Sequence, residues 1–347
     1  MTARYTLLSL FLVFSLQGCN LWDYLNIPER QPTVPQGNRG EARELLHSFM
    51  NARLADENED KLRAYLTDEA WNDYQGTDLT LRAEANQEFV GYKIMEESDL
   101  TDGRYAFTTN LQTLDRSQPY GANITEDLIV SFNNDEYRIA SARPLKTVEV
   151  RAVGTDLIWV RREKEETKEV KLFNLQDFPP RLTPLGGTTE LEAGRAGYAT
   201  AILNPENSRV AFGTTGTHGA LAVLKWTGET PDPEQVTLEP LDLYYGQHTI
   251  LQAFSPDARY LAVEIRSTAG TDRVEVYQVD EKNRLNFHLE QAFPVGEYNV
   301  SFRQWEPDSK AFLIRVSAGV QTNGDEAKMG TWRINVQTGE REKVIGG

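Results

Sequence analysis

Cysteine is nearly absent from this sequence, with a single residue, Cys19, in 347. Without a second cysteine no intrachain disulfide can form, so stability must come from ordinary hydrophobic cores. Histidine is also scarce, and its four residues show no His-x-x-x-His spacing that would predict a zinc site. The sequence contains neither a P-loop glycine motif nor a Gly-x-Ser-x-Gly elbow. We therefore predict no catalytic residues, no metal and no cofactor, and hence a protein that is not an enzyme.

Basic residues are outnumbered by acidic ones. The chain has 36 Lys and Arg against 52 Asp and Glu, a formal net charge of -16 and a pI of ≈ 4.8. Nucleic-acid binders need basic stripes, so we exclude a nucleic-acid partner. The apolar run at residues 6–16 is too short to span a bilayer, which needs about 20 residues, and no second apolar stretch approaches that length. A hydrophobic content of 39% is enough for packed cores, and the chain length favours two domains.

The N-terminal run covers residues 6–16 and follows Arg4. A short basic start, an apolar segment of this length and small residues behind it are typical of a secretory signal. Leu16-Gln17-Gly18-Cys19 comes directly after the run and resembles the lipobox of bacterial lipoproteins, although Gln17 replaces the usual Ala or Ser. The resemblance implies a signal peptide over residues 1–18 and a diacylglycerol on the sulfur of Cys19. The alternative is an ordinary secretory signal with a free cysteine near the cut.

A lipidated Cys19 places the protein outside the cytosol, in the cell envelope, with the membrane as its first partner. Two or three acyl chains hold a protein stably, because each buried methylene adds about 0.8 kcal/mol of membrane affinity. Residues 19–39 are then the lipidated tether. Pro28, Pro32 and Pro35 favour an extended polyproline-like conformation for this linker.

Residues 40–148 predict an α+β domain, helices first and an antiparallel sheet after them. Apolar spacing from Ala42 to Arg53 predicts a first helix, and Thr67 is the expected N-cap of a later one. Alternating patterns predict strands at 88–95, 104–114, 124–132 and 136–144. This order is similar to the cone-shaped nuclear transport factor 2-like fold, whose members include small-molecule enzymes, ligand binders and scaffolds. The one histidine of the segment, His47, is interpreted as structural or solvent-facing.

Residues 149–347 predict an all-β domain built from repeats. Leu203-Asn204-Pro205-Glu206, Phe254-Ser255-Pro256-Asp257 and Trp305-Glu306-Pro307-Asp308 recur at a spacing of 51 residues, a period that suits a propeller blade. The Ser-Pro-Asp turn followed by a β-rich run resembles the repeats of TolB-type propellers. The acids of these turns, Asp257 and Asp308, are interpreted as turn formers, because a calcium site needs six to eight converging oxygens.

Further strands are expected in each repeat, at 220–226, 273–279 and 331–336, with last strands at 235–238, 286–290 and 341–345. Residues 156–160, 170–175 and 181–183 fit an earlier, degenerate unit. That makes about four propeller-like blades, forming either a very small ring or an open arc. A β-sandwich with fortuitous spacing is the alternative.

The best candidates for a binding surface are aromatic and polar residues near the blade starts, since Tyr and Trp dominate interface hot spots. They are Tyr244, Tyr245, His248, Tyr298, Trp305 and Trp332. The leading hypothesis is a membrane-anchored envelope lipoprotein that acts as a non-catalytic binding or scaffolding module for a protein or cell-wall partner. One alternative is a small-ligand sensor or enzyme that uses the cavity of the α+β domain. Another is a sugar or peptidoglycan binder with an aromatic-lined groove on the propeller.

Overall fold

A computed structural model describes residues 38–347, apart from 77, 78, 80, 134, 322, 323 and 345–347. The expected signal peptide, Cys19 and nearly all of the tether lie outside the described residues, so the lipobox stays a prediction. None of the helices in the described part of the chain is both long and apolar enough to span a bilayer.

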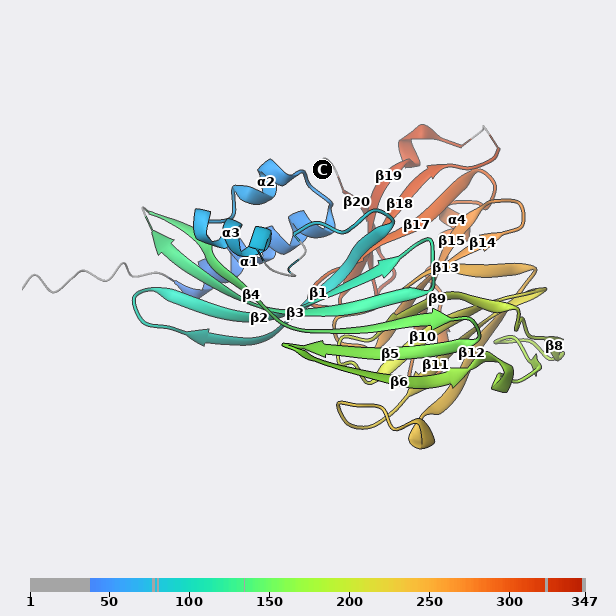
Figure 1. Cartoon of the computed structure of the whole chain (residues 1–347). Helices are drawn as coiled ribbons and strands as arrows, with labels where there is room; N and C mark the ends of the chain where they lie inside the picture. Colours follow the sequence, from blue (N-terminus) through green and yellow to red (C-terminus); the bar gives the residue numbers. More distant parts are fainter. Residues whose placement is uncertain (1–37, 77–78, 80, 134, 322–323, 345–347) are drawn as a thin grey trace, which may run out of the picture. The chain divides into compact units, whose positions relative to one another are not determined.

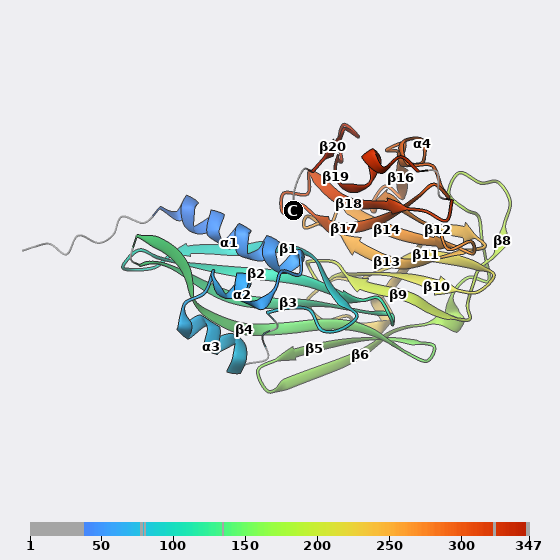
Figure 2. The same cartoon turned by 90° about the horizontal axis from the view of Figure 1, so that it is seen from above.

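Three helices open the described chain, α1 (Arg39–Leu54), α2 (Glu59–Arg63) and α3 (Asp68–Gly76). The apolar stripe predicted for the first helix is confirmed, because Leu45 is partly buried and its other members from Ala42 to Arg53 are buried. The predicted N-cap is confirmed as well, since the Thr67 hydroxyl accepts a hydrogen bond of 3.2 Å from the Ala70 N–H. The helices lie over one face of a long antiparallel sheet (Figures 1 and 2).

That sheet, here called the N-terminal sheet, has six strands in chain order: β1 (Gln87–Asp99), β2 (Arg104–Asp115), β3 (Tyr120–Asn133), β4 (Glu136–Val153), β5 (Asp156–Glu163) and β6 (Glu166–Asn174). The predicted domain boundary between residues 148 and 149 is wrong, because β4 continues through it. The expected degenerate blade is wrong too. Val150 on β4 pairs with Trp159 on β5, and Gly154 supplies the left-handed turn between them at φ +61°, so β5 and β6 extend the same sheet.

Three four-stranded antiparallel sheets follow, and we call them repeat sheets 1, 2 and 3. Repeat sheet 1 holds β9 (Gly197–Leu203), β10 (Arg209–Thr215), β11 (His218–Lys225) and β12 (Thr237–Tyr245). Repeat sheet 2 holds β13 (Gln247–Phe254), β14 (Tyr260–Ser267), β15 (Asp272–Gln278) and β16 (Asn283–Leu285). Repeat sheet 3 holds β17 (Tyr298–Trp305), β18 (Ala311–Ala318), β19 (Gly330–Asn335) and β20 (Arg341–Lys343).

The remaining elements are short. β7 (Arg181–Leu182) pairs with β8 (Leu191–Glu192) outside the repeat sheets, and single turns of 3₁₀ helix occur at Leu175–Asp177, Pro233–Gln235 and Glu326–Lys328. The strand predicted at 286–290 is wrong, because the last strand of repeat sheet 2 ends at Leu285 and α4 (Leu289–Ala292) follows it. The described residues 149–347 thus contain three repeat units rather than about four.

The 51-residue period corresponds to a turn that recurs between the first two strands of each repeat sheet. Asn207, Ala258 and Ser309 stand at the same repeat position and all adopt left-handed backbone, with φ of 56°, 59° and 60°. The turn-forming role predicted for the aspartates is confirmed: an Asp257 carboxylate oxygen accepts from the Arg259 N–H at 3.2 Å, and Asp308 accepts from the Lys310 N–H at 3.0 Å. The backbone geometry shared by these turns accounts for the two acids.

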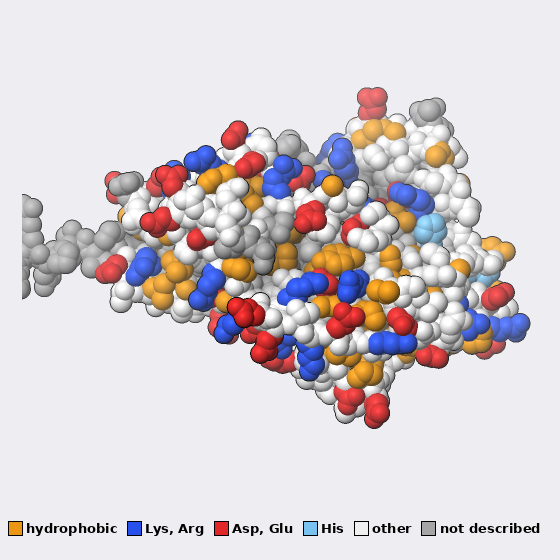
Figure 3. Space-filling model, in the orientation of Figure 1, with side chains coloured by type: hydrophobic (Ala, Val, Ile, Leu, Met, Phe, Trp, Pro, Cys, Tyr) orange, Lys and Arg blue, Asp and Glu red, His pale blue; other side chains and the backbone are white. Residues whose placement is uncertain are grey.

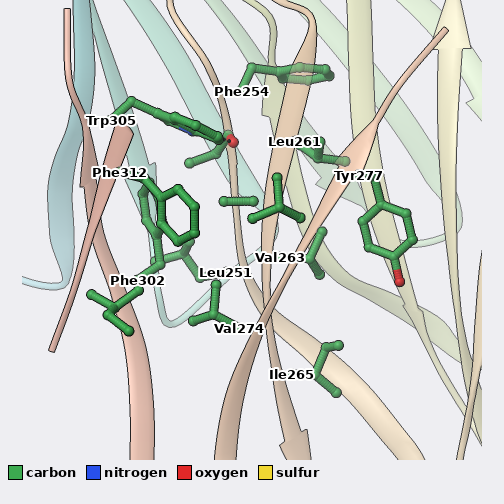
Figure 4. Close-up of a cluster of buried hydrophobic side chains, with 14 of the residues drawn as sticks. Leu251, Phe254, Leu261, Val263, Ile265, Val274, Tyr277, Phe302, Trp305 and Phe312 are labelled. Atoms are coloured by element: carbon green, nitrogen blue, oxygen red, sulfur yellow. Dashed lines mark hydrogen bonds between the residues drawn. The ribbon is translucent and has the colours of Figure 1, made fainter. Parts of the chain in front are cut away.

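The N-terminal sheet contacts both ends of the repeat array. β9 contacts β3 and β4, β13 contacts β9, β17 contacts β15, and β1 contacts β17. Gly121 makes the close approach of β3 to β9 possible, because a Cβ there would lie 2.8 Å from the Ala201 carbonyl oxygen. Val90 and Leu114 of the N-terminal sheet share one buried cluster with repeat sheets 1 to 3. In that cluster the rings of Phe302, Trp305 and Phe312 lie together (Figure 4).

Candidate functional site

Half of the predicted binding surface is buried. Tyr244, Tyr298 and Trp305 are 3%, 2% and 0% exposed, so their proposed place on a recognition surface is wrong. Each ring also has its polar atom engaged: the Trp305 indole N–H donates to the Ala253 carbonyl at 2.9 Å, and the Tyr244 hydroxyl lies 2.8 Å from the Tyr277 hydroxyl. These side chains form the core.

The other three predicted residues are accessible but do not form one surface. Tyr245 is 73% exposed and stacks on the His218 ring, with centroids 4.6 Å apart. His248, the next predicted residue along the chain, is exposed near the start of β13. Trp332 is half-buried on β19, where its indole N–H donates to the Lys328 carbonyl at 2.8 Å. The geometry therefore offers no aromatic groove built from these residues.

The space between the helices and the N-terminal sheet is filled by a buried charged network. Arg53 of α1 forms an ion pair with Glu126 of β3, and both side chains are fully buried. The Tyr74 hydroxyl donates to the same carboxylate at 3.4 Å, and the Arg53 guanidinium lies over the rings of Phe49 and Phe89. Burial, together with the neighbouring Glu126, raises the pKa of Tyr74 well above its ordinary value. The network leaves this interior with charged groups that are already paired.

His47 lies at the edge of this domain. Its Nδ1 is 2.5 Å from the Tyr92 hydroxyl, and burial followed by the charge of Arg43 lowers the pKa of the imidazole. Both observations suit the structural role predicted for His47.

A cavity of ≈ 650 Å³ opens where the N-terminal sheet meets the repeat sheets, and we call it the arginine pocket. This volume is within the usual range for small-molecule sites. Its wall consists of Arg53, Leu54, Asp56, residues 82–89, Arg116 and Arg303. Four arginines around one cavity are notable in a chain of net charge -16.

Three of these arginines are engaged by carboxylates, and the first is Arg53, through its buried pair with Glu126. Arg82 donates to Asp56 through Nε and Nη2 at 3.0 and 2.7 Å. Arg116 holds Glu88 with two hydrogen bonds, Nε to Oε1 at 2.6 Å and Nη2 to Oε2 at 2.9 Å. Its third nitrogen, Nη1, lies 3.6 Å from Oε1 of Glu264. Arg116 thus links β1 and the end of β2 to repeat sheet 2.

Glu264 is a buried carboxylate behind the pocket. It is 1% exposed on β14, and its Oε2 accepts the backbone N–H of Phe302 from β17 at 2.9 Å. Burial raises the pKa of Glu264 to about 7, while Arg116 and the Phe302 N–H pull in the opposite direction. The carboxyl group therefore changes charge near neutral pH.

Arg303 reaches the pocket through an irregularity in β17. Phe302 pairs with Ile314 and Gln304 with Leu313, so Arg303 is the extra residue of a β-bulge. The first strands of repeat sheets 1 and 2 carry corresponding bulges at positions 199 and 250, which are 51 residues apart. The third bulge occurs at 303, two residues beyond the position that the period predicts. Bulges often re-aim a side chain next to a functional site.

Sequence reasoning missed this site, although one signal was present. Glu264 interrupts the apolar run from Leu261 to Ile265, and a lone acid within such a strand is a candidate for a buried titratable group. No comparable signal marked Arg303, because the position of a bulge depends on how the strand packs.

A second cavity of ≈ 800 Å³ lies beside the turn between β9 and β10. Its charges are largely matched, with Arg143 paired to Asp127 and Arg161 paired to Glu229. Charged side chains of both signs are also interspersed over the face seen in Figure 3. Within the described residues no three His, Cys, Asp or Glu side chains converge as a metal site would require. The arginine pocket is therefore the more distinctive site.

Comparison with solved structures gives a distant likeness. TolB from Acinetobacter baumannii matches 89% of this chain and 69% of its own, with 12% identity and a TM-score of 0.33. The β-propeller domain of the Trilobed protease from Pyrococcus furiosus matches 73% of this chain and 72% of its own, with 10% identity and a TM-score of 0.31. The chain is thus distantly similar in structure to TolB-like and other β-propeller domains. No protein-family model and no curated protein matches the sequence.

Proposed function

We propose that this chain is a lipid-anchored, non-catalytic binding module of the cell envelope, and that the arginine pocket is where it binds. One observation carries the proposal: Arg116, at the end of β2, and Arg303 of repeat sheet 3 line one cavity, and Glu264 of repeat sheet 2 lies behind it, 3.6 Å from Arg116. Residues that contribute only to folding have no need to bring charge to such a junction, and charged groups that meet at a cavity commonly mark a functional site.

The chemistry of the pocket supports binding rather than catalysis. Its described wall contains no His, Cys, Ser, Thr, Tyr or Lys. Guanidinium groups do not lose their protons in proteins, so they orient and hold a ligand but do not serve as general bases. Two of its three acids, Asp56 and Glu88, are already hydrogen-bonded to arginines. A nucleophile next to an activating base is the arrangement that would favour an enzyme.

The alternatives predicted from the sequence have less support. A sensor or enzyme in the α+β domain needs free space beneath the helices, where the Arg53–Glu126 pair and aromatic rings lie instead. A sugar binder needs exposed aromatic rings along a groove, yet Tyr298 and Trp305 belong to the core. A scaffolding role without a small ligand would not explain the arginine pocket.

The anchor is tested in the native host by replacing Cys19 with Ser and separating membrane from soluble fractions. We expect the wild-type protein in the membrane fraction, with a mass increased by its acyl chains. The Cys19→Ser protein should be released, since the thioether cannot form. Equal membrane retention of both proteins, or an unmodified Cys19 in intact-mass analysis, would overturn the proposed anchor.

Binding is tested with purified protein that lacks residues 1–18 and carries Ser in place of Cys19. A panel of envelope-derived sugars, peptides and anionic metabolites is added, and thermal unfolding is recorded. We expect at least one compound to raise the Tm of this protein but not of its Arg303→Ala variant, and to be recovered chemically unchanged. Arg315→Ala is the matched control, because Arg315 is exposed on the adjacent strand β18 and lies outside the pocket wall. Conversion of the compound to a product would favour an enzyme instead.

A further inference from the structure

The arginine pocket contains a positive charge that no carboxylate neutralises. Arg82 is held by Asp56 and Arg116 by Glu88, whereas Arg303 has no ion pair among the described residues. Its bulge position also removes it from the regular pairing of β17 with β18. A guanidinium presents a planar fork of donors that suits carboxylate and phosphate oxygens. An unpaired one at a cavity wall is therefore an open position for an anion.

We propose that the arginine pocket binds a small anion bearing a carboxylate or phosphate group, held by Arg303 with Arg116, and that Glu264 takes up a solvent proton as the anion binds. This inference rests on the proposed binding function and adds the chemical class of the ligand. It also makes the ligand's affinity depend on pH.

The geometry around Glu264 explains the coupling. Its Oε1 lies 3.6 Å from the Arg116 Nη1, and its Oε2 accepts the Phe302 N–H, one residue before Arg303. Negative charge added on Arg116 and Arg303 therefore lies near this carboxylate and penalises its ionised form. The other charges that act on Glu264 are Asp272 and Glu88, which raise its pKa, and Arg266 lies close enough to interact with it as well.

These charges determine the direction in which the affinity for the anion changes with pH. Without ligand the pKa of Glu264 is about 7, and a bound anion raises it further. The anion thus binds more tightly to the protonated protein. Its affinity is highest below pH 7 and falls as the pH rises through and above 7, by at most about tenfold per pH unit.

One further carboxylate modulates the site. Glu84 lies in the pocket wall, is exposed, and has no ion pair among the described residues. Its charge opposes an incoming anion through solvent, where such an interaction is weak. Glu84→Gln should therefore strengthen anion binding only about two- to fivefold, and without changing its pH dependence.

The test is isothermal titration calorimetry at pH 6.5, 7.2 and 8 in low-chloride buffers of different ionisation enthalpy. Sulfate and succinate are the probes, because neither changes charge appreciably between pH 6.5 and 8, and they separate a tetrahedral oxyanion from a dicarboxylate. We expect one of them to bind the wild type with uptake of a fraction of a proton near pH 7. Arg303→Ala should weaken it at least tenfold at every pH, and Arg315→Ala should leave it unchanged.

The Glu264→Gln variant tests the coupling separately. Glutamine mimics the protonated carboxyl, so this variant should bind the probe at pH 6.5 about as well as the wild type and should lose most of the decline towards pH 8. An unaltered pH dependence would overturn the role of Glu264. Equal affinity of wild type and Arg303→Ala would overturn the anion site.

The two proposals fail in different ways. If neither probe binds while an uncharged panel compound stabilises the wild type but not Arg303→Ala, the anion inference is wrong and the binding function stands. If no compound of either kind binds, the proposed function is wrong. Arg303→Lys keeps the charge but not the planar fork and should bind with intermediate affinity, which guards against a misfolded alanine variant.

Discussion

The carboxylate of Glu264 accepts the backbone N–H of Phe302 at 2.9 Å, across the boundary between repeat sheets 2 and 3. A strand N–H would ordinarily bond within its own sheet or to solvent. Here the bulge at Arg303 follows immediately, and a side chain from the neighbouring sheet satisfies the donor. One buried acid therefore ties the repeat sheets together and lies behind the pocket.

Glu264 should make the stability of the protein depend on pH near neutrality. Its pKa is about 7 in the folded protein and 4.5 without burial, so the folded state binds the extra proton between these values. The stabilising contribution is fully present below about pH 4.5 and is lost as the pH rises through 7, by about 3 kcal/mol in all. Glu264→Gln should therefore be more stable than the wild type at pH 8 and similar to it at pH 5.

Urea unfolding at pH 5, 6, 7 and 8 measures this difference. Glu342→Gln, an exposed change on β20, is the control and should track the wild type at every pH. A constant difference between Glu264→Gln and the wild type from pH 5 to 8 would show that Glu264 does not titrate in this range.

Removing one partner of the buried pair of Arg53 and Glu126 should strongly destabilise the protein. Arg53→Met leaves a carboxylate in a fully buried position, and such a change typically costs about 3–5 kcal/mol. The double change Arg53→Met with Glu126→Leu removes both charges and should recover much of that loss. The free energy of unfolding from urea titrations tests both.

Arg39→Ala is the matched control for this pair. Arg39 and Asp99 are about half exposed, and exposed pairs contribute roughly 0–1 kcal/mol. If the double variant were less stable than Arg53→Met, an uncompensated charge would not be the reason for the loss.

Gly121 should tolerate no side chain. A Cβ at this position would lie 2.8 Å from the Ala201 carbonyl oxygen and 2.9 Å from the Ile202 Cα, both backbone atoms of β9. Gly121→Ala must push β3 away from β9, at a cost of roughly 1–3 kcal/mol. Gly76→Ala, where a Cβ meets no atom within 4 Å, is the control and should be neutral or slightly stabilising. A Cm for Gly121→Ala equal to that of Gly76→Ala would contradict the close approach.

Replacing Trp305 and replacing Tyr245 should change the stability of the protein by very different amounts, although both residues were predicted for one binding surface. Trp305→Ala removes a fully buried ring that bonds the Ala253 carbonyl and packs on Phe312, a loss of about 3–5 kcal/mol. Tyr245→Ala changes an exposed ring and should stay within about 0.5 kcal/mol of the wild type. Chemical unfolding of the two variants checks the assignment, and a mild effect at Trp305 would place that ring outside the core.

Local patterns in the sequence were enough to predict most of the helices and strands and the repeat. Helix periodicity, the Thr67 cap and the period of 51 residues are local patterns, and local geometry follows from them. The structure adds that Asn207, Ala258 and Ser309, at one position of this repeat, share a left-handed backbone.

How the sheets are joined and what they enclose depends on long-range packing, which local patterns do not specify. Alternation says which side chains share a face of a strand, but not which sheet covers that face. For this reason the sequence could not assign β5 and β6 to the N-terminal sheet, or separate buried Trp305 from exposed Tyr245. The meeting of Arg116, Glu264 and Arg303 depends on contacts across three sheets and on the position of one bulge, and both are set by long-range packing.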